Sequence, residues 1–201
     1  MTRWQKFYLA DPGIASIPAS NFSKKAAQVF ACGQKRKILD LACGGGRDTH
    51  LLAEHSLHVT GVDLARSGLE MARQTESGSD QHPVNFIQVD ALRLPFAKHT
   101  FEGVYCFGLL HEFCQPDGWQ AISAIMQEID RVLEPGGILL LAVLAGDPQQ
   151  GLPHVLLFTE KMLDDATWIF STLEKQEVDD IGCTGRKDYH TWQGVFIKRA
   201  F

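Results

Sequence analysis

Three acidic side chains stand at the carboxyl ends of three predicted strands, and a glycine-rich stretch follows the first of them. Asp40 belongs to the run ILDL, Asp63 closes HVTGVD, and Asp90 follows VNFIQV. Because the carboxyl ends of neighbouring parallel strands meet at one edge of a sheet, we expect the three acids to surround one ligand site. A carboxylate after the second strand can accept hydrogen bonds from both hydroxyls of a ribose. A carboxylate beside the glycines suits a ligand that carries an ammonium group.

Each of these acids also has a purely structural explanation. Asp63 suits a solvated position or the cap of a helix, and Asp90 suits a turn. In a ligand site, Asp90 would accept from an exocyclic amine while the backbone N–H of Ala91 faces a ring nitrogen. Together with the glycines, the three acids indicate a nucleoside that carries an amino-acid-like group.

The stretch ACGGGRD forms the loop after the first strand. Gly44 and Gly46 allow a tight turn and let a ligand touch the backbone. The helix that begins near Arg47 directs its free N–H groups toward the same place. A dinucleotide site uses the spacing G-x-G-x-x-G, but Thr49 stands where the third glycine would be. Asp40 would also repel a pyrophosphate, so the pattern disfavours a nicotinamide-dependent oxidoreductase.

Strands and helices alternate over most of the chain, which predicts right-handed βαβ units and an α/β fold with a parallel sheet. Two late strands, 173–179 and 192–198, are expected to form an antiparallel pair at one sheet edge. The first twenty residues are expected to be irregular because Pro12, Gly13 and Pro18 interrupt them. The other expected strands cover 37–41, 58–63, 84–89, 103–108 and 138–143. The expected helices cover 20–31, 47–55, 68–74, 117–133 and 159–169.

The helix expected over 117–133 has the clearest periodicity. Its large apolar residues recur at spacings of three and four, which predicts one buried face. Asp117 can cap its start. The apolar residues are Trp119, Ile122, Met126, Ile129 and Leu133.

The ordered set of motifs resembles the class I S-adenosylmethionine-dependent methyltransferases over roughly residues 36–145. ILDLACGGGRD resembles the family's first motif, D-x-[GA]-x-G-x-G, and VTGVDLARSGLEMAR resembles its second. VNFIQVDALRLPFAKHTFEGVYCFGLLHEF resembles the third and fourth motifs, and RVLEPGGILLLAV resembles the stretch that leads into the fifth strand. Four motifs in this order are far more specific than the glycine pattern alone.

The resemblance implies a Rossmann-like, doubly wound sheet of seven strands, mostly parallel with an antiparallel last strand, and S-adenosyl-L-methionine as the cofactor. It implies that the methionine part lies over residues 40–46 and that ribose and adenine lie at the ends of the second and third strands. The family most often has glycine where this chain has Ala42, whose methyl group slightly crowds the loop. The implied cofactor-binding residues are Asp40, Ala42, Gly44, Gly46, Asp63, Leu64, Asp90, Ala91, Phe107 and Gly108.

Methyl transfer from a sulfonium is an in-line displacement, so the protein mainly has to position the nucleophile and exclude water. His111, after the fourth strand, is the candidate acid–base residue, although a histidine there also starts a helix or packs without chemistry. Its neighbour Glu112 is interpreted as a surface or helix-start residue. Tyr8 and His154 are candidate substrate-binding residues. The aromatic residues Trp4, Phe7 and Tyr8 either fold over the cofactor as a lid or anchor the N-terminal segment.

Composition limits the class of protein. The 201 residues suit one domain, with an N-terminal segment (1–35), a cofactor-binding core (36–145) and a substrate-wall segment with the final strands (146–201). A net charge of −5 disfavours nucleic acids and anionic membranes as partners. The N-terminal stretch lacks the apolar core of a signal peptide, and no apolar stretch approaches transmembrane length. Five scattered cysteines indicate reduced thiols, with no disulfide framework and no metal site, and therefore a cytoplasmic protein.

The chain length favours a small-molecule methyl acceptor, because methyltransferases that act on nucleic acids or proteins usually carry added recognition domains. We expect a monomer or a homodimer. A second hypothesis is a non-catalytic protein that binds the cofactor only to shape an interaction surface. The family has no universal catalytic residue by which to separate the two.

Overall fold

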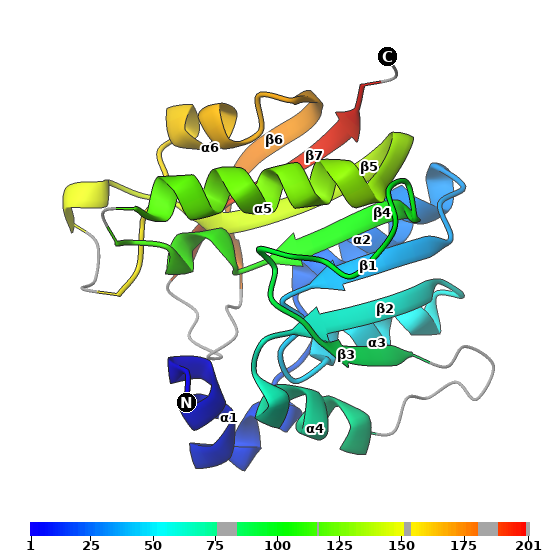
Figure 1. The fold of residues 1–201 in the computed structure, drawn as a ribbon, viewed down its shortest axis with the longest axis vertical. Helices are drawn as coiled ribbons and strands as arrows, with labels where there is room; N and C mark the ends of the chain where they lie inside the picture. Colours follow the sequence, from blue (N-terminus) through cyan, green and yellow to red (C-terminus); the bar gives the residue numbers. More distant parts are fainter. Residues whose placement is uncertain (76–83, 116, 151–153, 181–188, 200–201) are drawn as a thin grey trace.

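A computed structural model describes residues 1–75, 84–115, 117–150, 154–180 and 189–199. Within these residues one sheet has seven strands in the order β3-β2-β1-β4-β5-β7-β6 (Figure 1). The strands are β1 (Lys37–Leu41), β2 (His58–Asp63), β3 (Asn85–Gln88), β4 (Phe101–Phe107), β5 (Leu133–Leu144), β6 (Phe170–Asp180) and β7 (Tyr189–Lys198). The helices are α1 (Arg3–Ala10), α2 (Asn21–Cys32), α3 (Arg47–Glu54), α4 (Arg66–Gln74), α5 (Gly118–Val132) and α6 (Glu160–Ala166). Short 3-10 turns are η1 (Pro12–Ser16), η2 (Leu110–Glu112) and η3 (Pro148–Gln150).

The strand pairing confirms the predicted α/β sheet. β1 lies between β2 and β4, and these pairs and the β2–β3 and β4–β5 pairs are parallel. β7 is antiparallel to both β5 and β6, so the late strands form the expected antiparallel edge. The chain leaves β3 at one edge and re-enters the sheet at β4 on the other side of β1, so the strand order reverses between β1 and β4. A ligand site is expected outside the carboxyl ends of strands at such a reversal.

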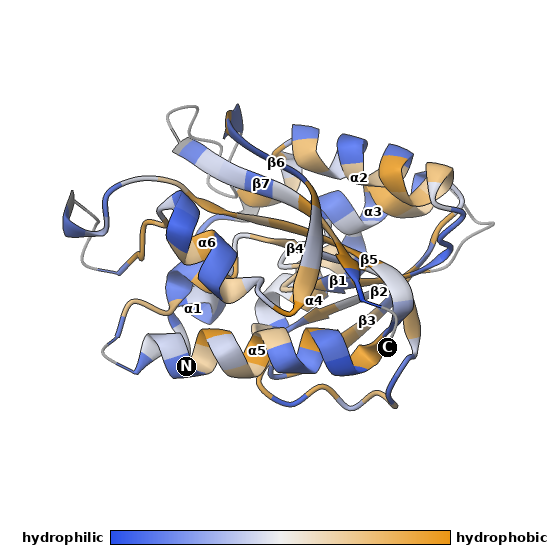
Figure 2. Ribbon diagram, turned by 90° about the horizontal axis from the view of Figure 1, so that it is seen from above, coloured by the Kyte–Doolittle hydropathy of each residue, from blue (hydrophilic) through white to orange (hydrophobic). Residues whose placement is uncertain are grey.

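Helices cover both faces of the sheet (Figure 2). α2 and α3 lie on one face, over a core that includes Ile38 and Tyr105. α5 and α6 lie on the other face, over Leu39 and Val104. Neighbouring residues of one strand thus point to opposite cores, as the two-residue period of a strand requires.

Two details of α5 differ from expectation. Trp119 is 42% exposed although the other four residues of the predicted apolar face are buried. It lies in the first turn of the helix, where its ring lies 6.0 Å from the ring of Phe158 between centroids. Asp117 occupies the N-cap position, but its side chain makes no capping hydrogen bond.

The expectation of an irregular N-terminal segment is wrong. Residues 3–10 form α1, which begins where the Thr2 hydroxyl accepts from the Gln5 N–H over 3.1 Å. The interrupting residues Pro12 and Gly13 follow the end of the helix, so they end it without preventing it. None of the described helices is long and apolar enough to cross a bilayer. Parts of the 146–201 segment, residues 151–153 and 181–188, lie outside the described residues.

A buried carboxylate joins three elements beneath the carboxyl edge of the sheet. Asp48, in the first turn of α3, accepts from the N–H of Ser20 over 2.7 Å and from the Ser20 hydroxyl over 2.9 Å. It also accepts from the Tyr105 hydroxyl over 2.9 Å. The same Ser20 hydroxyl caps α2 by accepting from the N–H of Ser23. The network therefore fixes the start of α2 and the start of α3 against β4.

We expect Asp48→Ala to lower the free energy of unfolding by about 3 kcal/mol, because three donors lose a charged acceptor in a buried place. Tyr105→Phe removes one donor and should cost about 1 kcal/mol. Urea unfolding followed by circular dichroism measures both. A change of less than about 0.5 kcal/mol for Asp48→Ala would show that the network does not hold these elements together.

Candidate functional site

The loop after β1 takes a left-handed backbone at alternate positions. Ala42, Gly44 and Gly46 have φ values of 65°, 55° and 80°. Gly44 and Gly46 adopt this conformation without strain, whereas a residue with a Cβ pays roughly 1 kcal/mol. The free-energy cost of having alanine at position 42 therefore arises from its own left-handed backbone conformation. The loop delivers the N–H groups at the start of α3 to the carboxyl edge of the sheet.

Asp63, the last residue of β2, holds this loop. Its Oδ2 accepts from the N–H of Gly44 over 2.8 Å, and its Oδ1 accepts from the N–H of Ala65 over 2.7 Å. Burial raises its pKa, and these backbone N–H groups oppose the rise. A carboxylate has about four accepting positions, so these bonds leave capacity for the hydroxyls of a ligand.

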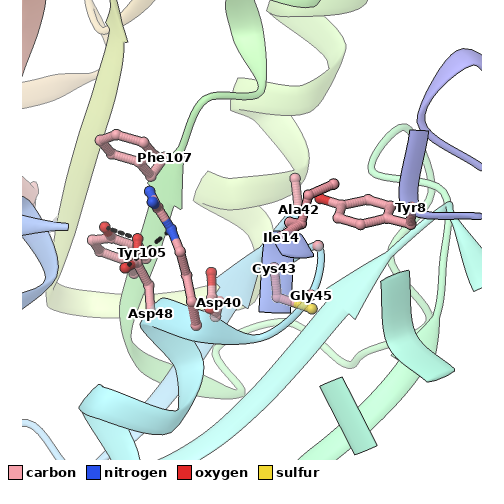
Figure 3. Close-up of a pocket in the computed structure, with 11 residues that line it drawn as sticks. Tyr8, Ile14, Asp40, Ala42, Cys43, Gly45, Asp48, Tyr105 and Phe107 are labelled. Atoms are coloured by element: carbon pink, nitrogen blue, oxygen red, sulfur yellow. Dashed lines mark hydrogen bonds and ion pairs between the residues drawn. The ribbon is translucent and has the colours of Figure 1, made fainter. Parts of the chain in front are cut away.

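Two cavities adjoin along the carboxyl edge, and Tyr8, Ala42 and Phe107 line both of them. The empty space, including the part open to solvent, is about 890 Å³ in the larger cavity and about 500 Å³ in the smaller one. The larger cavity is lined by Thr2, Trp4, Tyr8, Leu41, Ala42, Val62, Asp63, Leu64, Ala65, Val89, Asp90, Ala91, Phe107, Gly108, Leu109, Glu112 and Phe113. The smaller cavity is lined by Tyr8, Ile14, Asp40, Ala42, Cys43, Gly44, Gly45, Arg47, Asp48, Tyr105 and Phe107 (Figure 3).

Most of the predicted cofactor-binding residues therefore line one of two adjoining cavities. Asp63, Leu64, Asp90 and Ala91 lie together on the larger cavity. Asp90 is exposed, and its Oδ1 accepts from the N–H of Leu92 over 2.9 Å, so it also stabilises the turn that was its alternative explanation. Of the ten residues implied by the resemblance, Gly46 lines neither cavity; a Cβ there would meet the Cβ of Ala72 at 2.7 Å.

Asp40 lies at the base of the smaller cavity and is 2% exposed. Burial raises its pKa to about 8, although the Thr49 hydroxyl donates to its Oδ2 over 2.5 Å and opposes the rise. The carboxyl group is therefore largely protonated at neutral pH. A cationic group placed in this cavity would favour its ionised form.

Sequence reasoning missed Arg47 as a residue of the smaller cavity. Its guanidinium carbon lies 5.6 Å from the ring centroid of Phe107, and its Nη1 donates to the carbonyl of Pro18 over 3.3 Å. The triplet GRD directly after the glycines could have indicated it, because the first residues of a helix at this edge face the ligand. Asp48 and Tyr105 also line this cavity, as the polar floor that Figure 3 shows.

His111 and Glu112 lie differently from expectation. His111 is 7% exposed and lines neither cavity; its Nδ1 accepts from the N–H of Leu144 over 3.4 Å. Burial and then the charge of Arg3 lower its pKa to about 4. Glu112, interpreted from sequence as a surface or helix-start residue, instead lines the larger cavity with a side chain only 17% exposed.

α1 lies across the mouth of the two cavities. Figure 3 shows Tyr8 pointing from α1 toward Ala42. Its hydroxyl is so close to the loop that a Cβ on Gly44 would lie 2.1 Å from it, and its ring packs against Gly68. His154, the other predicted substrate residue, is exposed and is close enough to Glu112 to favour its charged form.

Comparisons with known proteins agree with this geometry. A family model described as a methyltransferase domain matches residues 39–141. The O-methyltransferase rstn1 of Aspergillus nomiae is 36% identical over 143 residues, which make up 70% of this chain and 60% of that protein. The chain spans less than two thirds of the length of the first curated relatives it matches.

Solved structures share the fold. A methyltransferase from Methanosarcina mazei described as SAM-dependent has a TM-score of 0.70 at 22% identity, covering 83% of this chain and 93% of its own. The 1,6-didemethyltoxoflavin-N1-methyltransferase of Burkholderia thailandensis, solved with S-adenosylhomocysteine, has a TM-score of 0.67 at 22% identity, covering 90% of this chain and 79% of its own. At these identities the likeness shows the fold alone.

We expect the contribution of Asp40 to the free energy of unfolding to fall as pH rises from about 4 to about 8, because the folded state then keeps a proton on Asp40 that the unfolded state has lost. The buried His111 contributes in the opposite direction between about pH 4 and pH 6.5, so the test compares the slopes of wild type and variant. Asp40 alone contributes a slope of up to about 1.4 kcal/mol per pH unit. Asp40→Asn should remove that contribution, whereas Asp117→Asn, at an exposed helix start, should retain it. Urea unfolding at four pH values measures the slope; equal slopes in wild type and Asp40→Asn would contradict the protonated state.

Proposed function

This chain belongs to the methyltransferase-domain family of class I S-adenosylmethionine-dependent methyltransferases, and we propose that it transfers a methyl group to a small-molecule acceptor. One observation carries the proposal. The loop after β1 is hydrogen-bonded to the acid that ends β2, and both adjoin a cavity that also contains Asp90 and Ala91. Acids and backbone donors at three strand ends fit a nucleoside with an amino-acid tail.

We assign the nucleoside to the larger cavity. Asp63 has accepting capacity for both ribose hydroxyls. Leu64 is 50% exposed and offers an apolar surface to the adenine. Asp90 and the N–H of Ala91 lie at the adenine edge. Phe107 and Gly108 complete this side of the cavity.

The amino-acid end then lies in the smaller cavity, against Gly44. Asp40 accepts the ammonium group, which makes its ionised form favourable again. Arg47 is positioned to bind the carboxylate, since a guanidinium suits that geometry. Tyr8 and Phe107 line both cavities, and their aromatic rings would attract the sulfonium of the bound cofactor.

When bound, S-adenosylmethionine supplies an activated methyl group whose carbon joins a lone pair of the acceptor while the C–S electron pair stays on sulfur. The chain's own residues position the two partners and exclude water. Tyr8 and the rest of α1 cover the reacting place. His111 is a weak base because its pKa is about 4, so we propose a positioning role for it, through its bond to Leu144.

The acceptor class rests on the relatives and on the cavity. The A. nomiae relative is named as an O-methyltransferase and the B. thailandensis structure as an N1-methyltransferase of 1,6-didemethyltoxoflavin, which support a small acceptor here. We propose that residues 1–201 act as one methyltransferase domain. Cys32, Cys43 and Cys106 are free thiols, which supports a cytoplasmic location.

Calorimetry should show tight binding of S-adenosylmethionine and of its demethylated product, and none of NAD. Asp63→Ala should weaken binding on the order of 100-fold, because two hydroxyls lose a charged acceptor and the Gly44 loop loses its support. Glu70→Ala, on the outer face of α4, is the matched control and should bind as wild type does. NAD binding without S-adenosylmethionine binding would overturn the proposal. Cofactor binding without methyl transfer to any acceptor would favour the non-catalytic alternative.

A further inference from the structure

Glu112 is the acid of the larger cavity whose role the cofactor leaves unassigned. Its carboxylate is paired with the guanidinium of Arg3 and accepts a hydrogen bond from the Trp4 side chain, both of α1. The imidazole Nε2 of His111 lies 3.8 Å from Glu112 Oε1, and His154 is near enough to favour the charged carboxylate. Burial raises the pKa of Glu112, and Arg3 is first among the groups that oppose the rise.

The Arg3 guanidinium lies in a place built for a cation. It contacts the Glu112 carboxylate and lies over the Trp4 ring, 5.2 Å from its centroid. A carboxylate together with an aromatic face is a combination that binds organic cations. The charged residues that line the larger cavity are Asp63, Asp90 and Glu112, all of them acids. The cavity therefore attracts positive charge.

Arg3 is a partner that can leave. Its side chain is 48% exposed, and α1 has no buried residue. α1 is held on α4 by the packing of Tyr8 on Gly68 and by the bond of the Ser67 hydroxyl to the carbonyl of Gln5. Tyr8 also lies against Gly44, the surface that a ligand must contact, so a ligand bound there would press on α1 and favour its displacement. Glu112 would then lose its two partners on α1, Arg3 and Trp4, and a largely buried carboxylate is costly without a replacement.

We propose that Glu112 anchors a protonated amine of the methyl acceptor, in the place that Arg3 holds, so that the acceptor is a cationic molecule with a flat apolar body. This inference rests on the proposed function, which puts the acceptor in the same cleft. Leu109 and Phe113 supply the apolar wall beside the anchor.

Three probes with one ring system test the anchor: 2-naphthylmethylamine, 2-naphthylmethanol and 2-naphthoate. Each is titrated into the full chain saturated with S-adenosylhomocysteine at pH 7, and Kd is read from intrinsic fluorescence. We expect the amine to bind at least about tenfold more tightly than the carboxylate, the factor of one charge-assisted hydrogen bond. Glu112→Gln should remove that preference and leave the alcohol within about twofold.

The Arg3→Ala variant distinguishes two roles of Glu112: binding the amine of the acceptor, or only holding α1 in place. If Glu112 binds the amine in place of Arg3, removing Arg3 removes a competitor and should tighten amine binding at least about threefold. If the pair only holds α1, then Arg3→Ala and Glu112→Gln should weaken all three probes alike, which would overturn the inference, as would equal binding of amine and carboxylate to wild type. Glu70→Gln is the matched control, an acid paired with Arg66 outside the cleft. Affinity for S-adenosylhomocysteine, measured first on each variant, tests the proposed function separately.

Discussion

The backbone N–H of Gly44 donates to Asp63 Oδ2 over 2.8 Å, and this bond joins the loop after β1 to the end of β2. The other features of the cleft depend on it. It supports the left-handed turn that starts α3, and so it helps to place Arg47 on the smaller cavity, beside Asp40 of β1. It also orients the carboxylate that borders the larger cavity. One hydrogen bond thus couples the two places where a bipolar ligand would be held.

The cleft contains buried carboxyl groups, which are unfavourable in a protein core unless they are compensated. Asp40 keeps its proton because burial outweighs the hydrogen bond from Thr49, whereas Asp48 is supplied with three donors. The two carboxyl groups are eight residues apart in sequence and have different roles. Asp48 is satisfied by the protein and stabilises the fold. Asp40 has one hydrogen bond, from Thr49, and its ionised form is favourable only beside a cation from outside, so a ligand with an ammonium group would recover stability that the fold gives up there.

Local sequence patterns are sufficient to predict the sheet and the glycine loop. The strands around Asp40 and Asp63, the helix over 118–132 and the antiparallel edge follow from periodicity and from turn residues within short windows. The cavity walls depend on contacts between distant segments, which no window contains. Ser20 reaches Asp48 across 28 residues, and Arg3 reaches Glu112 across 109. The sequence does not predict the helix at residues 3–10, because Pro12, Gly13 and Pro18 indicate an irregular segment although they all follow the helix.

His111 and Glu112 are adjacent in sequence, yet the fold gives them opposite environments. The 3-10 turn after β4 directs His111 toward β5, where it bonds to Leu144 and stays neutral. It directs Glu112 into the cavity, where burial raises the pKa of the carboxyl group and the cation and indole donor of α1 oppose that rise. A residue type alone does not decide which of two neighbours meets a ligand. The turn decides it, and the N-terminal helix supplies the partners, Arg3 and Trp4, that a ligand of Glu112 would have to replace.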